Sequence, residues 1–156
     1  MSLGASSQRV VDAGRQLGLD VEIHHFPDGT KTAADAAAAL GCDVSAIVKS
    51  LVFTIDDEPV MALVPGDRRL DMAALAALAG GGHVDRAPLE VVRAATGYAA
   101  GGTPPIGLAN PIRVFADAAL RRHELVWAAG GTPTTVFPIS IADLERVVHA
   151  VWADLS

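Results

Sequence analysis

Hydrophobic and polar residues follow a helical spacing in some segments and strict alternation in others, which predicts a chain of short helices and short strands. Apolar residues at helical spacing, with capping residues before them and often glycine after them, predict helices near residues 6–17, 33–40, 72–79, 88–95 and 141–148. The residues expected to start these helices are Ser6 or Ser7, Thr32, Asp71, Pro88 and Ser140.

Strands are expected where β-branched and aromatic residues follow period two, at residues 21–26, 47–54, 59–64, 83–86, 112–116, 124–128 and 136–138. A turn is expected at residues 27–29. The acidic residues 56–58 lie between two of the strands and predict an antiparallel hairpin. Hairpins argue against a purely parallel, doubly wound sheet. We therefore expect an α/β (α+β) fold, a single compact domain over residues 1–156 with short helices around the sheet.

One charged residue interrupts an apolar strand face. In the segment IVKSLVF, alternation places Ile47, Lys49, Leu51 and Phe53 on the same face. Lys49 is either an edge residue whose ammonium group reaches water, or a cation at a pocket wall that faces an anionic or carbonyl group of a ligand. The chain has two lysines and ten arginines, so a lysine is more informative here than in most proteins.

The loop TGYAAGGTPPIGL, residues 96–108, combines four glycines with two prolines and carries no formal charge. The pair Gly101 and Gly102 lets main-chain N–H groups approach a ligand without an intervening side chain. Pro104 and Pro105 stiffen the loop and remove two donors. Such a loop suits a carbonyl oxygen or a ribose, and an ordinary tight connection is the alternative. It lacks the Lys-Ser/Thr end of a P-loop, which argues against a triphosphate site.

Composition narrows the possible functions. The formal charge is -6, whereas proteins that bind nucleic acid mainly by neutralising phosphates are usually basic. Contact with a nucleic acid should therefore be confined to one end of the nucleic acid.

No apolar run reaches the roughly 18 residues of a membrane span, and no signal peptide is expected. Cys42 is the single cysteine, which fits a reducing compartment and a cytoplasmic location. The histidines are scattered, and we expect no metal site.

Six segments, in order, resemble the YbaK/EbsC/ProX family of aminoacyl-tRNA deacylases. They are TAADAAAALG, IVKSLVF, VPGDRRLD, TGYAAGGTPPIGL, VFADAAL and VWAAGGTPTTVFPISIADL, and the resemblance runs from about Phe26 to Val148. It implies a compact domain with a mixed, mostly antiparallel, barrel-like sheet, and a reaction that uses no metal and no cofactor. The implied reaction hydrolyses the ester between a wrong amino acid and tRNA, often tRNA-Pro carrying cysteine or alanine.

The resemblance also implies how such a protein works and with whom. It implies a freestanding trans-editing hydrolase whose partners are the acceptor end of aminoacyl-tRNA and a prolyl-tRNA synthetase. We also expect no membrane partner, and we expect a monomer or a homodimer.

Roles follow from the resemblance residue by residue. Lys49 matches the family's strand lysine, and Gly101 to Pro105 matches its Gly-x-x-x-Pro loop, which flanks the aminoacyl ester and the terminal adenosine. Lys49, Gly101 and Gly102 are therefore expected to act in catalysis, with the glycine N–H groups at the oxyanion. The residues expected to contact substrate are Phe26, Thr30, Val48, Thr103, Pro104, Pro105, Ile106, Gly107, Asp117, Gly130, Gly131 and Thr134. Asp117 matches an acidic position of the family, and a structural role is its alternative.

One departure from the family pattern bears on specificity. Cysteine-specific relatives tend to carry a serine beside the second Gly/Pro loop, residues 130–133, where this chain has Ala129, although Thr134 and Thr135 could supply hydroxyl groups. This argues against a preference for cysteine. Two other functions stay open: a hydrolase of small esters that needs no tRNA, and a module that binds aminoacyl-tRNA or a small ligand without cleaving it.

Overall fold

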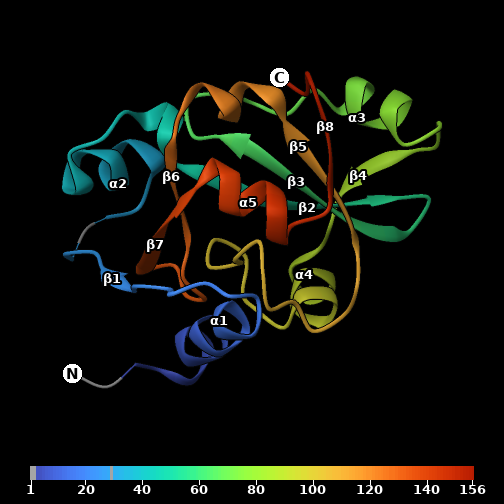
Figure 1. The fold of residues 1–156 in the computed structure, drawn as a ribbon. Helices are drawn as coiled ribbons and strands as arrows, with labels where there is room; N and C mark the ends of the chain where they lie inside the picture. Colours follow the sequence, from blue (N-terminus) through green and yellow to red (C-terminus); the bar gives the residue numbers. More distant parts are fainter. Residues whose placement is uncertain (1–2, 29) are drawn as a thin grey trace.

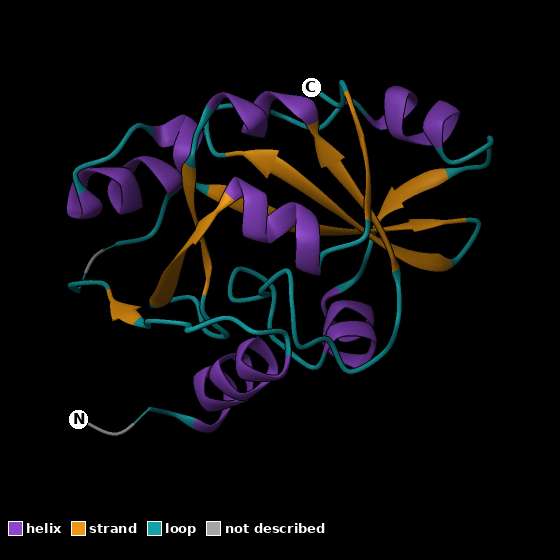
Figure 2. Cartoon of the chain, viewed as in Figure 1, coloured by secondary structure: helices purple, strands orange, loops and turns teal. Residues whose placement is uncertain are grey.

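The structure, a computed structural model, describes residues 3–28 and 30–156 and contains two sheets with helices around them, as Figure 1 and Figure 2 show. In chain order the elements are α1 (Ala5–Gln16), β1 (His24–His25), α2 (Ala33–Leu40), the 3-10 helix η1 (Val44–Ala46), β2 (Val48–Ile55), β3 (Glu58–Pro65), α3 (Met72–Leu78), β4 (Val84–Arg86), α4 (Leu89–Thr96), β5 (Arg113–Asp117), the 3-10 helix η2 (Ala118–Arg122), β6 (Leu125–Ala129), β7 (Thr135–Ser140), α5 (Ile141–Val147) and β8 (Ala150–Ala153).

The larger sheet has five strands in the order β4-β2-β3-β5-β8, and the smaller has three in the order β1-β7-β6. β2 pairs antiparallel with β3 and β4, whereas β5 pairs in parallel with β3 and β8. The predicted hairpin is confirmed: Asp56 and Asp57 form its turn with φ of 48° and 69°, the left-handed values that a tight two-residue hairpin requires. An isolated parallel bridge between Ile47 and Trp127 links the two sheets. The α+β class and the mixed sheet are therefore confirmed.

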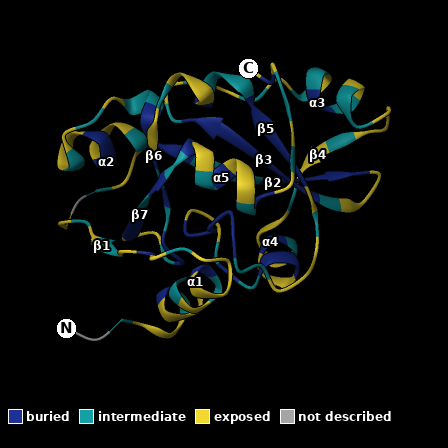
Figure 3. Ribbon diagram, in the orientation of Figure 1, coloured by how far each residue is buried: buried dark blue, intermediate teal, exposed yellow. Residues whose placement is uncertain are grey.

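The larger sheet is covered on both faces, and its central strand β3 is buried from Val60 to Pro65, as the dark blue ribbon in Figure 3 shows. Met61 and Leu63 of β3 point to a core shared with α1, α4 and α5. Val60 and Ala62 point to the other face, where Leu75 of α3 packs. Because both faces of the sheet are buried, its central strands are apolar rather than alternating. None of the helices in the described part of the chain is long and apolar enough to cross a membrane.

Local signals located most helix starts. The Thr32 hydroxyl accepts a hydrogen bond from Asp35 N–H, and the Asp35 carboxylate accepts one from Thr32 N–H, which forms a capping box at α2. These main-chain and hydroxyl hydrogen bonds, first among them that of Lys31 N–H, lower the pKa of Asp35. Asp71 and Ser140 cap α3 and α5 as predicted.

The secondary structure differs from the predictions in three places. α1 begins after Gly4 without a side-chain cap, because Ser7 is buried inside the helix and its hydroxyl donates to Gly130 O at 2.7 Å. The strand expected at 21–26 is confined to β1. β8 was not predicted, and it forms by pairing in parallel with the distant β5. The turn expected at 27–29 includes Gly29, which lies outside the described residues.

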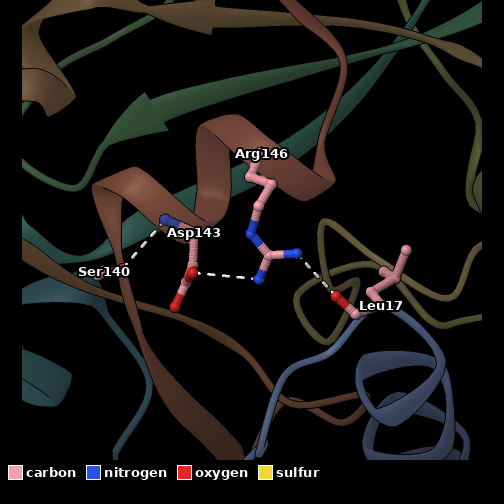
Figure 4. A network of polar contacts seen from close by, with 4 residues as sticks. All are labelled: Leu17, Ser140, Asp143 and Arg146. Atoms are coloured by element: carbon pink, nitrogen blue, oxygen red, sulfur yellow. Dashed lines mark hydrogen bonds and ion pairs between the residues drawn. The ribbon is translucent and has the colours of Figure 1, made fainter.

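A small polar network joins the first and last helices, and Figure 4 shows it in close-up. Arg146 of α5 donates to Leu17 O at the end of α1 at 2.9 Å and to Asp143 Oδ1 at 3.2 Å. Asp143 N–H in turn donates to the Ser140 hydroxyl that caps α5. A carbonyl group at the end of α1 is thereby satisfied by a cation, which favours the end of a helix.

Candidate active site

A cavity of about 280 Å³ lies between β2 and β6 next to the Ile47–Trp127 bridge; we call it the β6 cavity. Its walls come from β2, β6, β7, the start of α2 and the first Gly/Pro loop. The lining residues are Phe26, Thr30, Lys31, Thr32, Ala33, Ala36, Ile47, Val48, Lys49, Ser50, Leu51, Gly101, Thr103, Trp127, Ala129, Pro133, Thr135 and Val136.

A second cavity of about 450 Å³ adjoins the first and reaches α4; we call it the α4 cavity. The two share one wall, made of Lys49 to Leu51 together with Gly101 and Thr103. Arg69 and Arg86 also line the α4 cavity. Among the described residues, no Asp or Glu lines either cavity, so the combined cleft is basic although the chain is acidic overall.

Lys49 lies half-buried at the shared wall, and its ammonium group donates to Arg68 O. Burial lowers the pKa of Lys49 below its ordinary value, because removing the ammonium group from water penalises the charged form. The carboxylate of Asp67 opposes this shift, and the guanidinium of Arg69 adds to it. The pocket-wall interpretation of this lysine is therefore the one that the geometry favours.

The two catalytic glycines predicted from the sequence have different surroundings. Gly101 has φ of +86° and lines both cavities, and a Cβ added to it would meet no atom of the described chain within 4 Å. Gly102 is buried, and a Cβ on it would lie 2.6 Å from the Thr132 main chain. Gly102 N–H donates to Ala99 O at 3.0 Å. The prediction that Gly102 N–H stabilises an oxyanion is thus corrected, since that donor is already used.

The rest of the first loop is a buried support and not a cavity wall. Pro104, Pro105 and Ile106 are buried, and Gly107 packs against α1 while its carbonyl accepts a hydrogen bond from Tyr98 Oη at 3.0 Å. None of these four residues lines either cavity, in contrast to the predicted substrate contacts. The two prolines therefore hold Gly101 and Thr103 in place from behind.

The second Gly/Pro loop is also structural at the residues that were predicted to bind. Gly130 accepts the Ser7 hydrogen bond, and a Cβ on Gly131 would lie 2.8 Å from Ser6 O. Thr134 O accepts from Phe26 N–H at 2.8 Å. These three residues lie outside both cavities, and Ala129, Pro133 and Thr135 line the β6 cavity in their place.

For Asp117 the structure supports the structural alternative and not a substrate contact. Its side chain is 1% exposed and lies outside both cavities. One carboxylate oxygen caps η2 at Ala119 N–H, and the other accepts from the Ser156 hydroxyl. Of the predicted residues, those that do reach the cleft are Phe26, Thr30, Val48, Lys49, Gly101 and Thr103. In the part of the chain that the structure describes, no group of three or more His, Cys, Asp or Glu residues could hold a metal ion.

Comparison with known proteins assigns the chain to a family. Residues 27–147 match the family model described as the aminoacyl-tRNA editing domain. The chain belongs to this family. The editing domain is 42% identical over 127 residues to the proline–tRNA ligase of Nitratidesulfovibrio vulgaris. The aligned region covers 81% of this chain and 22% of the ligase. The chain thus spans about a fifth of the length of that relative. It is 28% identical to the protein YwhH of Bacillus subtilis, with 90% of each covered.

A solved structure extends the comparison to the whole fold. The crystal structure of a proposed trans-editing enzyme for prolyl-tRNA synthetase superimposes on the editing domain with a TM-score of 0.94 and 39% identity, over 99% of both chains. The arrangement of sheets and helices described above is therefore that of an experimentally observed fold.

Sequence reasoning missed several residues of the editing domain's cleft. Trp127 reaches the β6 cavity from a strand far along the chain from Lys49, so no local pattern could place it there, whereas Thr135, named from the sequence as a possible source of a hydroxyl group, does line this cavity. Arg69 and Arg86 reach the α4 cavity from a loop and from a short edge strand. Ser50 had a usable signal, because it follows Lys49 in the same strand, but its significance depends on which strand edges are paired.

Proposed function

We propose that this editing domain hydrolyses the ester of a mischarged aminoacyl-tRNA, namely tRNA-Pro carrying alanine or a similarly small amino acid. The observation that carries the proposal is the pair of adjoining cavities with Lys49 and Gly101 on their shared wall. An aminoacyl ester joins an amino acid to a ribose, and two cavities that meet at a cation suit those two parts. We propose further that the whole chain acts as one editing domain, in trans, on tRNA charged by a prolyl-tRNA synthetase.

The β6 cavity suits a small apolar side chain. Phe26, Val48, Trp127 and Val136 give it apolar walls, and the described residues place no carboxylate there to pair with a cationic side chain. Ala129 occupies the position where a hydroxyl would favour a thiol-bearing substrate. Alanine is therefore the first candidate, and cysteine is a result that the assay can return.

The α4 cavity suits the terminal nucleotide. Arg69 and Arg86 can pair with a phosphate, since a guanidinium group binds phosphate oxygens in a bidentate manner. Such a local basic site also reconciles the acidic chain with tRNA, because contact would be limited to the acceptor end.

The proposed reaction needs no protein nucleophile. A water oxygen attacks the ester carbonyl carbon, the carbonyl oxygen becomes an oxyanion, and the bond to the ribose oxygen breaks. The attacking water loses a proton, the ribose oxygen gains one, and the carbonyl re-forms as the amino acid leaves. The Lys49 ammonium polarises the carbonyl or holds the terminal phosphate, and main-chain N–H groups at the cleft stabilise the oxyanion, an interaction worth about 3–4 kcal/mol per donor in a preorganised site.

A deacylation panel tests the proposal. Wild type and Lys49→Ala would be offered tRNA-Pro charged with alanine, cysteine, serine or proline, and the same amino acids esterified to a small alcohol. We expect hydrolysis of alanyl-tRNA-Pro that is lost in Lys49→Ala, with prolyl-tRNA spared. Equal hydrolysis of the small esters would identify an esterase that needs no tRNA. Binding of charged tRNA without hydrolysis would identify a sequestering module, and either result would refute the proposal.

A further inference from the structure

The polar groups of Ser50 are unusual among those on the shared wall. Its hydroxyl oxygen is buried and is the side-chain polar atom that finds no hydrogen-bond partner among the described residues. The residue lines both cavities. Because buried polar groups in folded proteins are normally paired, an unpaired one in a cleft calls for an explanation.

The register of the hairpin fixes the direction of the Ser50 main chain. Pro59 pairs with Thr54, and Pro65 pairs with Val48. A proline has no N–H to give, so these are the pairs that exchange no hydrogen bonds across the two strands. Hydrogen-bonded and non-hydrogen-bonded pairs alternate along an antiparallel ladder. Ser50, which pairs with Leu63, is an even number of residues from both Thr54 and Val48, so the Ser50–Leu63 pair is also a non-hydrogen-bonded pair. Its N–H and C=O therefore point away from β3.

On that far side, Ser50 lies in a gap of the sheet. β4 pairs with β2 only at Phe53–Ile55, and Ala87 N–H adds one more hydrogen bond, to Val52 O at 3.3 Å. Pro88 then starts α4 and takes the chain away. At the other end, β6 meets the chain at the isolated Ile47–Trp127 bridge, and the described residues form no further strand pair between β6 and β2. Both cavities open into this gap.

An aminoacyl group has the donor and the acceptor that this gap lacks. Its α-amino N–H and its ester C=O are spaced like the N–H and C=O of one residue in an extended strand. In an antiparallel hydrogen-bonded pair, two opposite residues exchange both of their hydrogen bonds. We propose that the main chain of Ser50 pairs with the aminoacyl group in this way. Ser50 C=O accepts from the α-amino group, and Ser50 N–H donates to the ester carbonyl oxygen.

This pairing rests on the proposed function, and it assigns Ser50 N–H as the group that stabilises the oxyanion in the proposed reaction. Gly102 N–H is occupied by Ala99 O, whereas Ser50 N–H faces the cleft beside Lys49. As water attacks, the carbonyl oxygen gains negative charge and the Ser50 N–H bond to it strengthens. The same contacts select for a substrate with a free α-amino group and leave its side chain to the β6 cavity.

The experiment combines variants with a substrate change. Proline is tolerated at a strand edge whose N–H makes no ladder bond, so Ser50→Pro should fold, while Leu51→Pro, whose N–H pairs with β3, should unfold at a clearly lower temperature. Ser50→Ala removes the hydroxyl and keeps the main chain. The substrates are tRNA-Pro esterified with alanine or with propionic acid, which lacks the α-amino group, and each rate is divided by the spontaneous rate of that ester.

We expect Ser50→Pro to lose about a hundredfold in kcat/KM with its melting temperature kept, and to be at least about tenfold less active than Ser50→Ala, which retains the main-chain N–H. Wild type should favour the alanyl over the propionyl ester by about tenfold or more. If Ser50→Pro fails to fold, replacing Ser50 by its α-hydroxy acid removes only the N–H and should give the same loss. A folded, fully active N–H-deficient variant would overturn the pairing, as would equal use of both esters. A wild type that hydrolyses no charged tRNA would instead refute the proposed function, and this inference with it.

Discussion

Substituting Gly102 by alanine tests the contact between the two Gly/Pro loops. Gly102 does not have a left-handed φ, so alanine can adopt its backbone conformation. On conformational entropy alone, glycine to alanine at such a position stabilises a protein by about 0.4–1 kcal/mol. The new Cβ, however, would lie 2.6 Å from the Thr132 Cα and carbonyl carbon and 2.9 Å from Pro133 N. These are main-chain atoms, which cannot move aside as a flexible side chain does.

The cost of this contact follows from the distances. Ordinary van der Waals contact begins at 3.4 Å, so the loops must separate by several tenths of an ångström. Overpacking of this kind costs about 1–3 kcal/mol. Set against the entropic gain, we expect a net loss of about 1–2 kcal/mol, or a melting temperature about 2–8 °C lower for a domain of this size. We also expect kcat/KM to fall about tenfold, because Gly101 and Thr103 move with the loop.

Thermal unfolding and hydrogen exchange give the assay. In Gly102→Ala, exchange should accelerate at the amides of Gly130 and Thr135, which make hydrogen bonds within the second loop. The neighbouring variant Gly101→Ala is the control: its Cβ meets no atom of the described chain within 4 Å, and its φ of +86° strains the first loop alone. Exchange in the second loop should then be unchanged. A Gly102→Ala protein that is more stable than wild type would refute the loop contact.

Three further predictions follow from the site and its supports. Lys49→Ala should abolish measurable deacylation without lowering the melting temperature, because removing a half-buried cation relieves its desolvation. Burial lowers the pKa of Lys49, so its ammonium group loses the proton below the ordinary pKa of 10.5. The enzymatic rate, corrected for spontaneous hydrolysis, should therefore fall as the pH rises towards 10.5. A rate that stays constant up to pH 10.5 would contradict the role of the charge. Ser7→Ala should lower the free energy of unfolding in urea by about 1–3 kcal/mol, because it leaves the Gly130 carbonyl without its hydroxyl donor. Ser6→Ala, at the neighbouring position of the same helix, should leave the free energy of unfolding nearly unchanged. Equal effects of the two substitutions would show that the Ser7 hydrogen bond is not stabilising.

The parts of the fold that depend on nearby residues could be predicted from the sequence. The caps at Thr32, Asp71 and Ser140 act over three residues, and the β2–β3 hairpin acts over a two-residue turn. Lys49 could be singled out because strand alternation is equally local. Resemblance supplied the family, which the comparisons confirm.

The predictions failed where a residue's partner lies far along the chain. Ser7 looked like a helix cap, but its hydroxyl is needed by Gly130, and Asp117 looked like a substrate contact, but Ser156 and Ala119 use its carboxylate. β8 forms only because β5 offers it an edge. Ser50 is a further case, since its role follows from where β4 stops. In each case the deciding contact is tertiary, and the sequence around the residue does not contain it.

The bridge between Ile47 and Trp127 also bears on the order in which the molecule becomes functional. The hairpin β2–β3 can close early, because its contacts are local, whereas the walls of the β6 cavity come from segments between Phe26 and Val136 and must wait for β6 and β7 to dock. Lys49 therefore lies on an exposed strand edge until the smaller sheet arrives. Local opening of the smaller sheet would leave the larger sheet and its hairpin intact while dismantling the cleft. Mild heat or denaturant should accordingly abolish the activity of the protein before the protein unfolds globally.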